Sequence, residues 1–534
     1  GASGGASASP NTPGFAAEFG GGWFDYWGSN GAYGCNAQRL GSGYQRVFYG
    51  TNIANGLTIQ SFYMTYGGTS WGWMPAPVVY TSYDYGSAID EARGLREKAR
   101  GIKLMGHFLQ TVKDLTQMDR ATGLVASSPN VRLYHNVNPE TGTRLLVATH
   151  APNNAQTDDV FSFKAALPDG EYSIPQAGTL RLKGHDAKLW LAGYTLERQR
   201  LVYSTSELFT HLRQGAGDLA LFYGRQGEDG EMVLRYSSAP TVTVLDGKVE
   251  SVFDAAKGDL RLNYLHQGLA RVRISGGGRP DLTLLLADLP TAETFWRQET
   301  TDGVLLQRGP TLVRTAAVKG KTLDLTGDTE SDSPLEVWAP AGVTSVRWNG
   351  ASVAVEKGVG GSLIAKRDLS GPVAVTLPDL TKASWRFQAG SPEAAKDFDD
   401  SAWAVAKPGR TASFVKPPGG QPLLNMDDYN FHHGDVWYRG RYTVQPGASK
   451  LDLHYGAGGA GMVQVWLDGR YIGQHVLPTG LPRPPGQGLA TFTIPEDLQA
   501  PGERVLSVMV RNNSHHWDLD VDDLHKEARG LISA

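Results

Sequence analysis

The chain has 534 residues, a formal net charge of −4 and a charged fraction of 19%. This nearly balanced charge gives no support to nucleic-acid binding. The sequence has no long apolar run, so it predicts no membrane span. A glycine count of 66 with 40% hydrophobic residues favours about three or four loop-rich, strand-rich domains over a helical protein.

The N-terminal ten residues and the single cysteine predict neither a signal peptide nor an intrachain disulfide. Residues 1–10 have no basic start and no apolar stretch, so they predict a linker or a cut end and not a signal peptide. Cys35 is the single cysteine, and no intrachain disulfide can form.

The stretch around Glu18 carries the first chemical signal. Phe15, Ala16 and Ala17 predict a buried strand that ends at the carboxylate, and Gly20–Gly22 and a run of aromatic residues follow. Aromatic faces beside a carboxylate suit a sugar ring, because the ring stacks on a flat surface while a charged group meets the reacting carbon. We therefore interpret Glu18 as the nucleophile of a retaining glycosidase; the alternative is a surface glutamate beside a glycine-rich turn.

Residues 36–112 continue as alternating helix and strand. We expect a helix over 36–50, a strand over 57–66 and, after a long loop, a second helix. That helix should hold Asp90 and Glu91 in its first turn, where the helix dipole favours negative charge. Its expected apolar face consists of Leu95, Ala99, Ile102, Gly106 and Leu109. This order is a piece of an alternating β/α fold that is too short to close a sheet of its own.

From residue 115 onward, short alternating runs separated by Asp-Gly turns predict a mainly β, multidomain chain. Ser206–Leu212 can be a short helix or a strand extension. The boundaries we expect are 1–114 for the β/α part, 115–295 for an antiparallel β domain, 296–377 for a small β-sandwich and 378–534 for a jelly-roll-like domain, which begins with a connector.

Two tyrosines join Glu18 as candidates. Tyr63 lies near the end of the second strand and Tyr83 in the loop before the second helix. If Glu18 and Tyr63 end successive parallel strands, both side chains reach the same edge of a barrel. Each tyrosine can equally be a core residue with one hydroxyl partner.

Other polar groups give weak signals. The pairs His432-His433 and His515-His516 are adjacent, so on a strand each pair points to opposite faces and makes a poor chelate. Asp518, Asp520 and Asp522 lack the glycine and terminal glutamate of a calcium loop and favour a solvated acidic edge. We therefore expect no metal site, and the sequence has no G-x-S-x-G anchor for Ser-His-Asp catalysis.

Several motifs together resemble one family. The segments are Glu18–Gly28, Arg46–Tyr49, Phe62–Gly72, Tyr80–Ile89, Leu201–Thr210, Phe398–Trp403, Tyr438–Gly440 and Ala528–Leu531. In order and spacing they resemble the large, multidomain β-galactosidases of glycoside hydrolase family 35. The resemblance covers nearly the whole chain.

The resemblance implies a fold and an activity. It implies the C-terminal part of a (β/α)8 barrel followed by β domains, and removal of terminal β-linked galactose with retention. Glu18 matches the nucleophile at the end of barrel strand seven, and Trp23, Tyr63 and Tyr83 match aromatics around the galactose. No metal or organic cofactor is implied. The substrate partner is a β-galactoside glycan, and the intact protein is expected to be secreted or periplasmic.

The resemblance also implies that the acid/base carboxyl group lies outside this chain. A retaining enzyme needs two carboxyl groups about 5 Å apart. In the family the acid/base glutamate comes from strand four, yet only 17 residues precede Glu18. We expect the chain to lack this group and to be inactive alone. The N-terminal barrel half can belong to a longer chain or to a separate polypeptide, and it can supply a partner for Cys35. The alternative function is a non-catalytic carbohydrate-binding or scaffold fragment. The sequence does not define the linkage, the aglycone or the oligomeric state.

Overall fold

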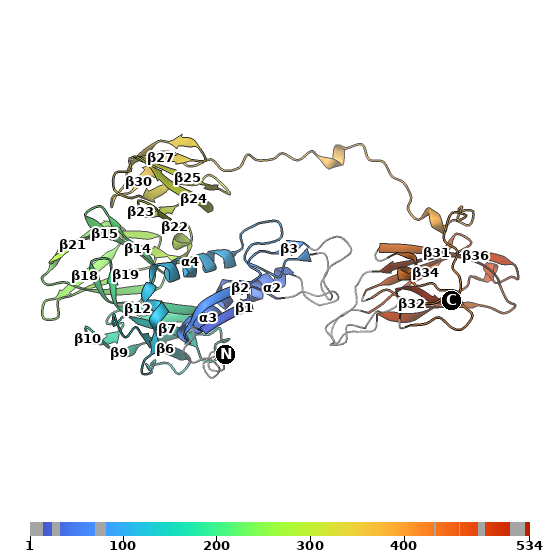
Figure 1. Cartoon of the computed structure of the whole chain (residues 1–534), viewed down its shortest axis with the longest axis horizontal. Helices are drawn as coiled ribbons and strands as arrows, with labels where there is room; N and C mark the ends of the chain where they lie inside the picture. The colour runs from blue at the N-terminus through green and yellow to red at the C-terminus, as the bar shows by residue number, and fades with distance from the viewer. Residues whose placement is uncertain are drawn as a thin grey trace. The chain divides into compact units, whose positions relative to one another are not determined.

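The computed structural model describes residues 14–23, 33–69, 82–411, 413, 415–431, 434–458, 460–478, 486–512 and 529–534 (Figure 1). The four histidines of the two pairs and the three aspartates of the acidic edge lie outside these residues. The chain divides into two compact units. The first comprises 1–21, 39–63 and 95–376, and the second comprises 22–38, 64–94 and 377–534.

The N-terminal part of the first unit is a parallel strand pair with a helix between its strands. Strand β1 (Gly14–Gly20) pairs with β2 (Leu57–Tyr63), and α3 (Ser42–Ala54) lies between them in the sequence. Helix α2 (Tyr33–Arg39), which precedes α3, belongs to the second unit except for Arg39. The expected strand, helix, strand order is confirmed. The prediction of a buried first strand is wrong, because Phe15 is 58% exposed and of the Phe15–Ala17 run only Ala16 is buried. Among the described strands β1 pairs only with β2, which leaves much of it uncovered.

The second predicted helix begins later than expected. Helix α4 spans Glu97–Thr111, so Asp90 and Glu91 precede it. Asp90 instead closes a turn, since its carboxylate accepts from the Gly94 N–H at 2.7 Å. The expected apolar face is also wrong. The buried positions of α4 are Lys98, Gly101, Leu104, Met105 and Phe108.

The stripe of α4 that we expected to be buried contributes to an apolar groove. Ile102, Gly106 and Leu109 line a cavity of ≈ 700 Å³ together with the β2 residues Leu57 and Ile59. Helix α4 therefore has two apolar stripes. Hydrophobic spacing alone does not identify the one that meets the β domain.

Two larger sheets follow in the same unit. The eight-stranded sheet has the order β18 (Val249–Asp254), β19 (Asp259–Leu265), β16 (Asp229–Arg235), β13 (Gln199–Ser204), β12 (Ala187–Leu196), β7 (Arg144–His150), β6 (Val131–Val137) and β5 (Asp119–Arg120). The five-stranded sheet has the order β14 (Glu207–Gln214), β15 (Gly217–Gly224), β21 (Arg279–Asp288), β20 (Leu269–Gly276) and β17 (Pro240–Asp246). Two hairpin-like pairs join β9 (Phe163–Leu167) with β10 (Gly170–Ile174) and β8 (Asp158–Phe161) with β11 (Leu180–Lys183).

Pairing in this region is mostly, but not wholly, antiparallel. The pair β15 and β21 is parallel, which corrects the purely antiparallel expectation. Parallel neighbours need a long crossover, and the chain between these two strands supplies β16 to β20. Ser206–Leu212 belongs to strand β14, so the strand alternative is the correct one.

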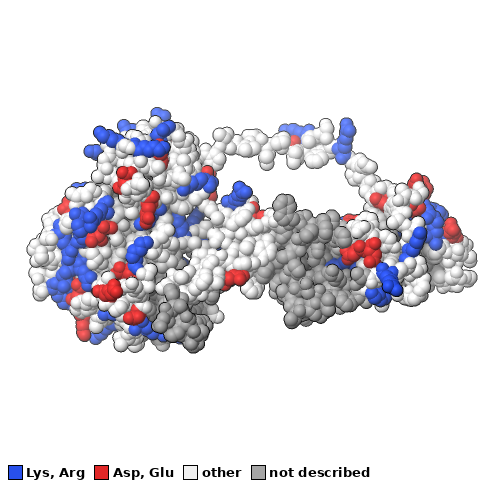
Figure 2. All heavy atoms as spheres, in the orientation of Figure 1, with Lys and Arg blue, Asp and Glu red and all other residues white. Residues whose placement is uncertain are grey.

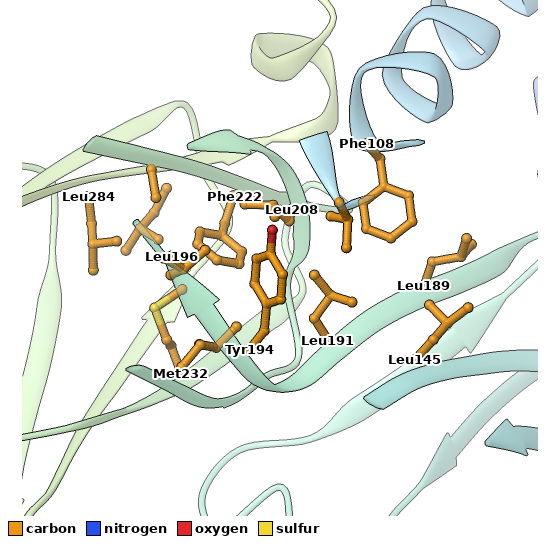
Figure 3. Close-up of a cluster of buried hydrophobic side chains, with 14 of the residues drawn as sticks. Phe108, Leu145, Leu189, Leu191, Tyr194, Leu196, Leu208, Phe222, Met232 and Leu284 are labelled. Atoms are coloured by element: carbon orange, nitrogen blue, oxygen red, sulfur yellow. The ribbon is translucent and has the colours of Figure 1, made fainter. Parts of the chain in front are cut away.

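A continuous hydrophobic core joins the helices to these sheets. Phe108 of α4 lies with Leu145, Leu189 and Leu191 of the eight-stranded sheet in one cluster (Figure 3). Val47 and Ile53 of α3 belong to the same cluster. Helices that follow the candidate nucleophile are therefore anchored on the β domain by buried apolar surface, at about 25 cal/mol per Å².

Two small sheets complete the first unit after the short helix α5 (Leu289–Ala292). One has the order β22 (Phe295–Thr300), β23 (Gly303–Arg308), β26 (Glu336–Trp338), β30 (Leu363–Ala365) and β29 (Val355–Lys357). The other has the order β24 (Leu312–Lys319), β25 (Thr322–Asp328), β27 (Ser345–Trp348) and β28 (Ala351–Val353), with β25 and β27 parallel. They enclose a core around Leu323, Val337 and Val346.

The second unit holds the short pair β3 (Gly68–Thr69) and β4 (Ser82–Tyr83) and a two-sheet C-terminal domain. Its four-stranded sheet has the order β31 (Gly434–Thr443), β36 (Glu503–Asn512), β33 (Met462–Leu467) and β34 (Arg470–Val476). Its three-stranded sheet has the order β35 (Gln487–Thr493), β32 (Lys450–Gly456) and β37 (Gly530–Ser533). Short 3₁₀ turns of this unit lie at Leu380–Lys382, Pro392–Ala394, Met426–Tyr429 and Glu496–Leu498, and a further one, Lys113–Gln117, lies in the first unit.

The mainly β, multidomain fold class is confirmed, while the domain boundaries stay predictions. On the face in view, acidic and basic side chains of the described residues are interspersed (Figure 2). Of the helices described, none has the length and apolar character needed to cross a membrane.

Candidate active site

Glu18 lies at a bulge near the C-terminal end of β1. The register runs from Ala16 opposite Gln60 to Phe19 opposite Phe62, so Ala17 and Glu18 together oppose one residue of β2. A bulge inserts one unpaired residue and re-aims the side chains beside it. Glu18 is exposed, as a carboxylate that meets substrate must be.

Tyr63 ends the neighbouring strand at the same edge. The last pair of the register is Gly20 with Tyr63, and the Gly21 N–H donates to the Tyr63 carbonyl at 3.0 Å. Glu18 lies near the carboxyl end of β1, and Tyr63 ends β2. Because the strands are parallel, these two ends meet at the same edge, which is where barrel enzymes hold their catalytic groups. The structure thus places these two candidates on adjacent strand ends.

Two buried polar side chains hold the backbone that follows Glu18. Gln45 of α3 donates from Nε2 to the Gly20 carbonyl at 3.3 Å, and Lys98 of α4 donates from Nζ to the Gly21 carbonyl at 2.6 Å. Gln45 and Lys98 are only 2% and 1% exposed. Buried polar groups are costly unless bonded, so the two contacts fix the path of the chain after the nucleophile candidate.

Sequence reasoning did not single out Gln45 or Lys98. For Lys98 a signal was present, since the other buried positions of α4 are apolar or glycine. Gln45 shares its buried face with Ser42 and Arg46, so it gave no such signal. A lysine between buried neighbours at helical spacing indicates a specific partner for its ammonium group.

Trp23 and Tyr83 belong to the second unit, and both contact Tyr85. The Trp23 N–H donates to the Tyr85 carbonyl at 3.0 Å, and the Tyr83 ring stacks on the Tyr85 ring with centroids 6.0 Å apart. Trp23 is 57% exposed and Tyr83 is half-buried. The four candidates therefore form two pairs, one in each unit.

Asp84 organises the loop that carries Tyr83. It is buried, and its carboxylate accepts from the Gly86 N–H at 3.0 Å and from the Glu91 N–H at 3.1 Å. Gly22 permits the close approach of this loop, because a Cβ atom there would lie 1.8 Å from the Tyr85 carbonyl oxygen. The glycine is required by packing and not by an unusual backbone angle.

A buried ion cluster ties α3 to the β domain. The Arg46 guanidinium contacts Asp186 at 2.9 Å and also Glu207, and Arg225 contacts the same two carboxylates at 2.7 Å and 3.1 Å. Burial acts to raise the pKa of Asp186, but the positive charges of Arg225 and Arg46 outweigh it and hold that pKa well below its usual range. The two arginines thus keep the buried Asp186 carboxylate ionised.

A serine and a histidine also meet in the interior. Ser206 Oγ lies 2.8 Å from His266 Nε2, and His266 Nδ1 lies 2.8 Å from the Glu228 carbonyl oxygen. Burial lowers the pKa of His266 to about 4. Ser206 and His266 are only 1% and 2% exposed, so a substrate cannot reach them, and their hydrogen bonds belong to the packing of the protein interior. Within the described residues, no group of three or more His, Cys, Asp or Glu side chains is arranged to hold a metal ion.

Comparison with known families matches the chain segment by segment. A model of glycosyl hydrolases family 35 matches residues 3–109. Models of β-galactosidase domain 2, domain 3 and the second all-β domain match residues 114–295, 286–364 and 398–516.

Individual relatives extend over most of the chain. A probable β-galactosidase B of Sclerotinia sclerotiorum is 35% identical over 483 residues, which is 88% of this chain and 47% of that protein. A probable β-galactosidase B of Neosartorya fischeri is 32% identical over 538 residues, covering 98% and 51%. A probable β-galactosidase C of Talaromyces marneffei is 32% identical over 535 residues, covering 97% and 52%. The chain spans about half the length of the curated relatives it matches.

Proposed function

The chain belongs to glycoside hydrolase family 35, the β-galactosidases, and from that premise we propose that Glu18 is the nucleophile of a retaining exo-β-galactosidase. The observation that carries the proposal is the place of Glu18 at the bulged carboxyl end of β1, beside the end of the parallel strand β2. From the family resemblance we also propose Trp23, Tyr63 and Tyr83 as galactose-binding residues.

The proposed reaction follows the two-step course of retaining enzymes. The Glu18 carboxylate attacks the anomeric carbon and forms a galactosyl-enzyme, while an acid/base carboxyl group protonates the leaving oxygen. The same group then activates water, which releases galactose. The family resemblance assigns the acid/base to a barrel strand that precedes this segment, so we propose that the 534-residue chain alone does not turn over and that the intact protein acts outside the cytoplasm.

The test needs two proteins. One is the 534-residue chain, and the other joins it to the residues encoded immediately upstream in its gene. With an aryl β-galactoside, we expect turnover in the longer protein only. There Glu18→Gln should abolish turnover, and Glu18→Gly should regain it in azide with formation of α-galactosyl azide, because azide takes the place of the missing carboxylate.

The control is Glu97→Gln, which removes an exposed glutamate at the start of α4. It should leave turnover unchanged. Full activity of the longer protein with Glu18→Gln would refute the assignment of the nucleophile. Ordinary turnover by the 534-residue chain would refute the inactivity of the chain alone.

A further inference from the structure

The face of the C-terminal four-stranded sheet that is turned away from its core carries an aromatic strip. The segment around Glu393 and Ala395 covers part of this face, since Arg439 of β31 donates to both of their carbonyls. Trp437 of β31 and Trp466 of β33 have ring centroids 4.9 Å apart, and Trp466 and Tyr471 of β34 have centroids 5.4 Å apart. Side chains alternate along strands, so these rings lie opposite the core-facing residues Tyr438 and Val465. We call Trp437, Trp466 and Tyr471 the aromatic strip; β31, β36 and β34 can be followed in Figure 1.

The strip has polar side chains beside it on the same face. Gln464 of β33 donates to Gln474 of β34 at 3.0 Å, and the Tyr471 hydroxyl lies 3.3 Å from the same Gln474 oxygen. Asp435 of β31 pairs with Arg511 of β36 through two contacts of 2.8 Å. The face thus combines flat apolar rings with amide, hydroxyl and charged groups.

At its β31 end the strip meets a pocket of ≈ 360 Å³. Trp437 belongs to both features, Asp435 beside the strip also lines the pocket, and Trp403, Tyr429 and Phe431 line it as well. Phe431 is 50% exposed and Tyr471 is 47% exposed, although large aromatic side chains are usually buried in a core, while Trp437 and Trp466 are half-buried. The pocket has the size of a small-ligand site, for which about 300 to 1,000 Å³ is typical.

We propose that the aromatic strip and this pocket form a carbohydrate-binding surface that shares no residue with the candidate active site. Pyranose rings of a glycan would stack their C–H faces on the strip, and their hydroxyl groups would bond to Gln474, Asp435 and Arg511. The pocket takes one ring at the end of the strip. The combination favours a neutral sugar over an apolar partner, because an apolar ligand would take these amide, hydroxyl and charged groups out of water without replacing the hydrogen bonds that they make to it.

The proposal does not rest on catalysis, so binding by the 534-residue chain tests it directly. We would measure the retardation of the chain in native gels that contain a soluble galactan, arabinogalactan or xyloglucan. We expect retardation by at least one of them. Trp437→Ala and Trp466→Ala should weaken binding about tenfold, and Tyr471→Ala about threefold, which matches one lost ring contact each.

Two control variants separate binding at the strip from binding elsewhere on the chain. Trp385→Ala removes an exposed tryptophan of the connector and should bind normally. Glu18→Gln should also bind normally, since the carboxylate belongs to the candidate active site. Tyr471 is half-exposed, so its loss tests the strip even if a tryptophan variant fails to fold.

Three results would each overturn the proposal. The first is that none of the three polysaccharides retards the unmodified chain. The second is that Tyr471→Ala and the folded tryptophan variants bind as well as the unmodified chain. The third is that Glu18→Gln loses binding. The last result would assign binding to the candidate active site and leave the strip as a protein-packing face.

Discussion

Arg46 allows a direct test of whether buried ion pairs of α3 stabilise the segment around Glu18. It lies in α3, next to Gln45, and only 4% of it is exposed. Its guanidinium contacts Asp186, Glu207 and the Ala187 carbonyl, the last at 2.8 Å. Arg46 therefore ties α3 to the β domain, while Gln45 reaches the backbone after Glu18.

Replacement of Arg46 by methionine keeps the aliphatic volume and removes the charge. Asp186 and Glu207 would then face Arg225 as the remaining arginine of this cluster, with one of their two balancing charges lost. Removal of one partner from a buried ion pair costs about 3 to 5 kcal/mol, because the remaining charge stays desolvated. We expect the free energy of opening of α3 to fall by this amount.

Hydrogen exchange of the α3 amides measures that free energy locally, which matters because a multidomain chain does not unfold in one step. A loss of about 3 to 5 kcal/mol corresponds to exchange faster by about a hundredfold to several thousandfold. The control is Arg213→Met, since Arg213 is 67% exposed in its pair with Glu197 and should contribute at most about 1 kcal/mol. An Arg46→Met protein whose α3 amides exchange within threefold of the unmodified rate would refute the reasoning.

Three further outcomes are expected. Lys98→Met leaves the Gly21 carbonyl without its buried donor, at a cost of about 1 to 3 kcal/mol. Amide hydrogen exchange at the end of β1 should therefore become at least about fivefold faster. The control Lys113→Met, at an exposed lysine, should leave the exchange rate unchanged. The depressed pKa of His266, about 4, should appear in an NMR titration as an imidazole that stays neutral at pH 5. Stability is then full above pH 6.5 and decreases as pH falls toward 4, since only the unfolded state takes up the proton in that window; a titration near pH 6.5 would contradict this. Gly22→Ala should expose the loop to limited proteolysis, because its Cβ has no room, while Gly34→Ala, with nothing within 4 Å, should not.

Much of the local order could be predicted from the sequence. The strand ending near Glu18, the helical stretch after residue 36 and the strand ending at Tyr63 follow from hydrophobic spacing and turn residues, which are local properties. The change to short β-strands after residue 115 follows in the same way. The motifs that resemble family 35 are contiguous segments, so they too were readable without a fold.

The helix that follows residue 90 shows where this reading fails. Asp90 and Glu91 have the composition of a helix start, yet contacts within the loop, such as Asp84 with the Glu91 N–H, take them out of the helix. The buried face of α4 was predicted wrongly because two apolar stripes share one helix, and only the β domain decides which stripe it covers.

The sequence by itself determined the family, the mainly β class and the candidate residues, because each depends on residue type and short-range spacing. Only the tertiary structure decided the bulge at Glu18, the parallel pairing of β1 with β2, and the buried contacts of Gln45 and Lys98 with the chain after it. Those features depend on residues about 25 to 80 positions apart in sequence, and no local pattern encodes which distant carbonyl a buried side chain will meet.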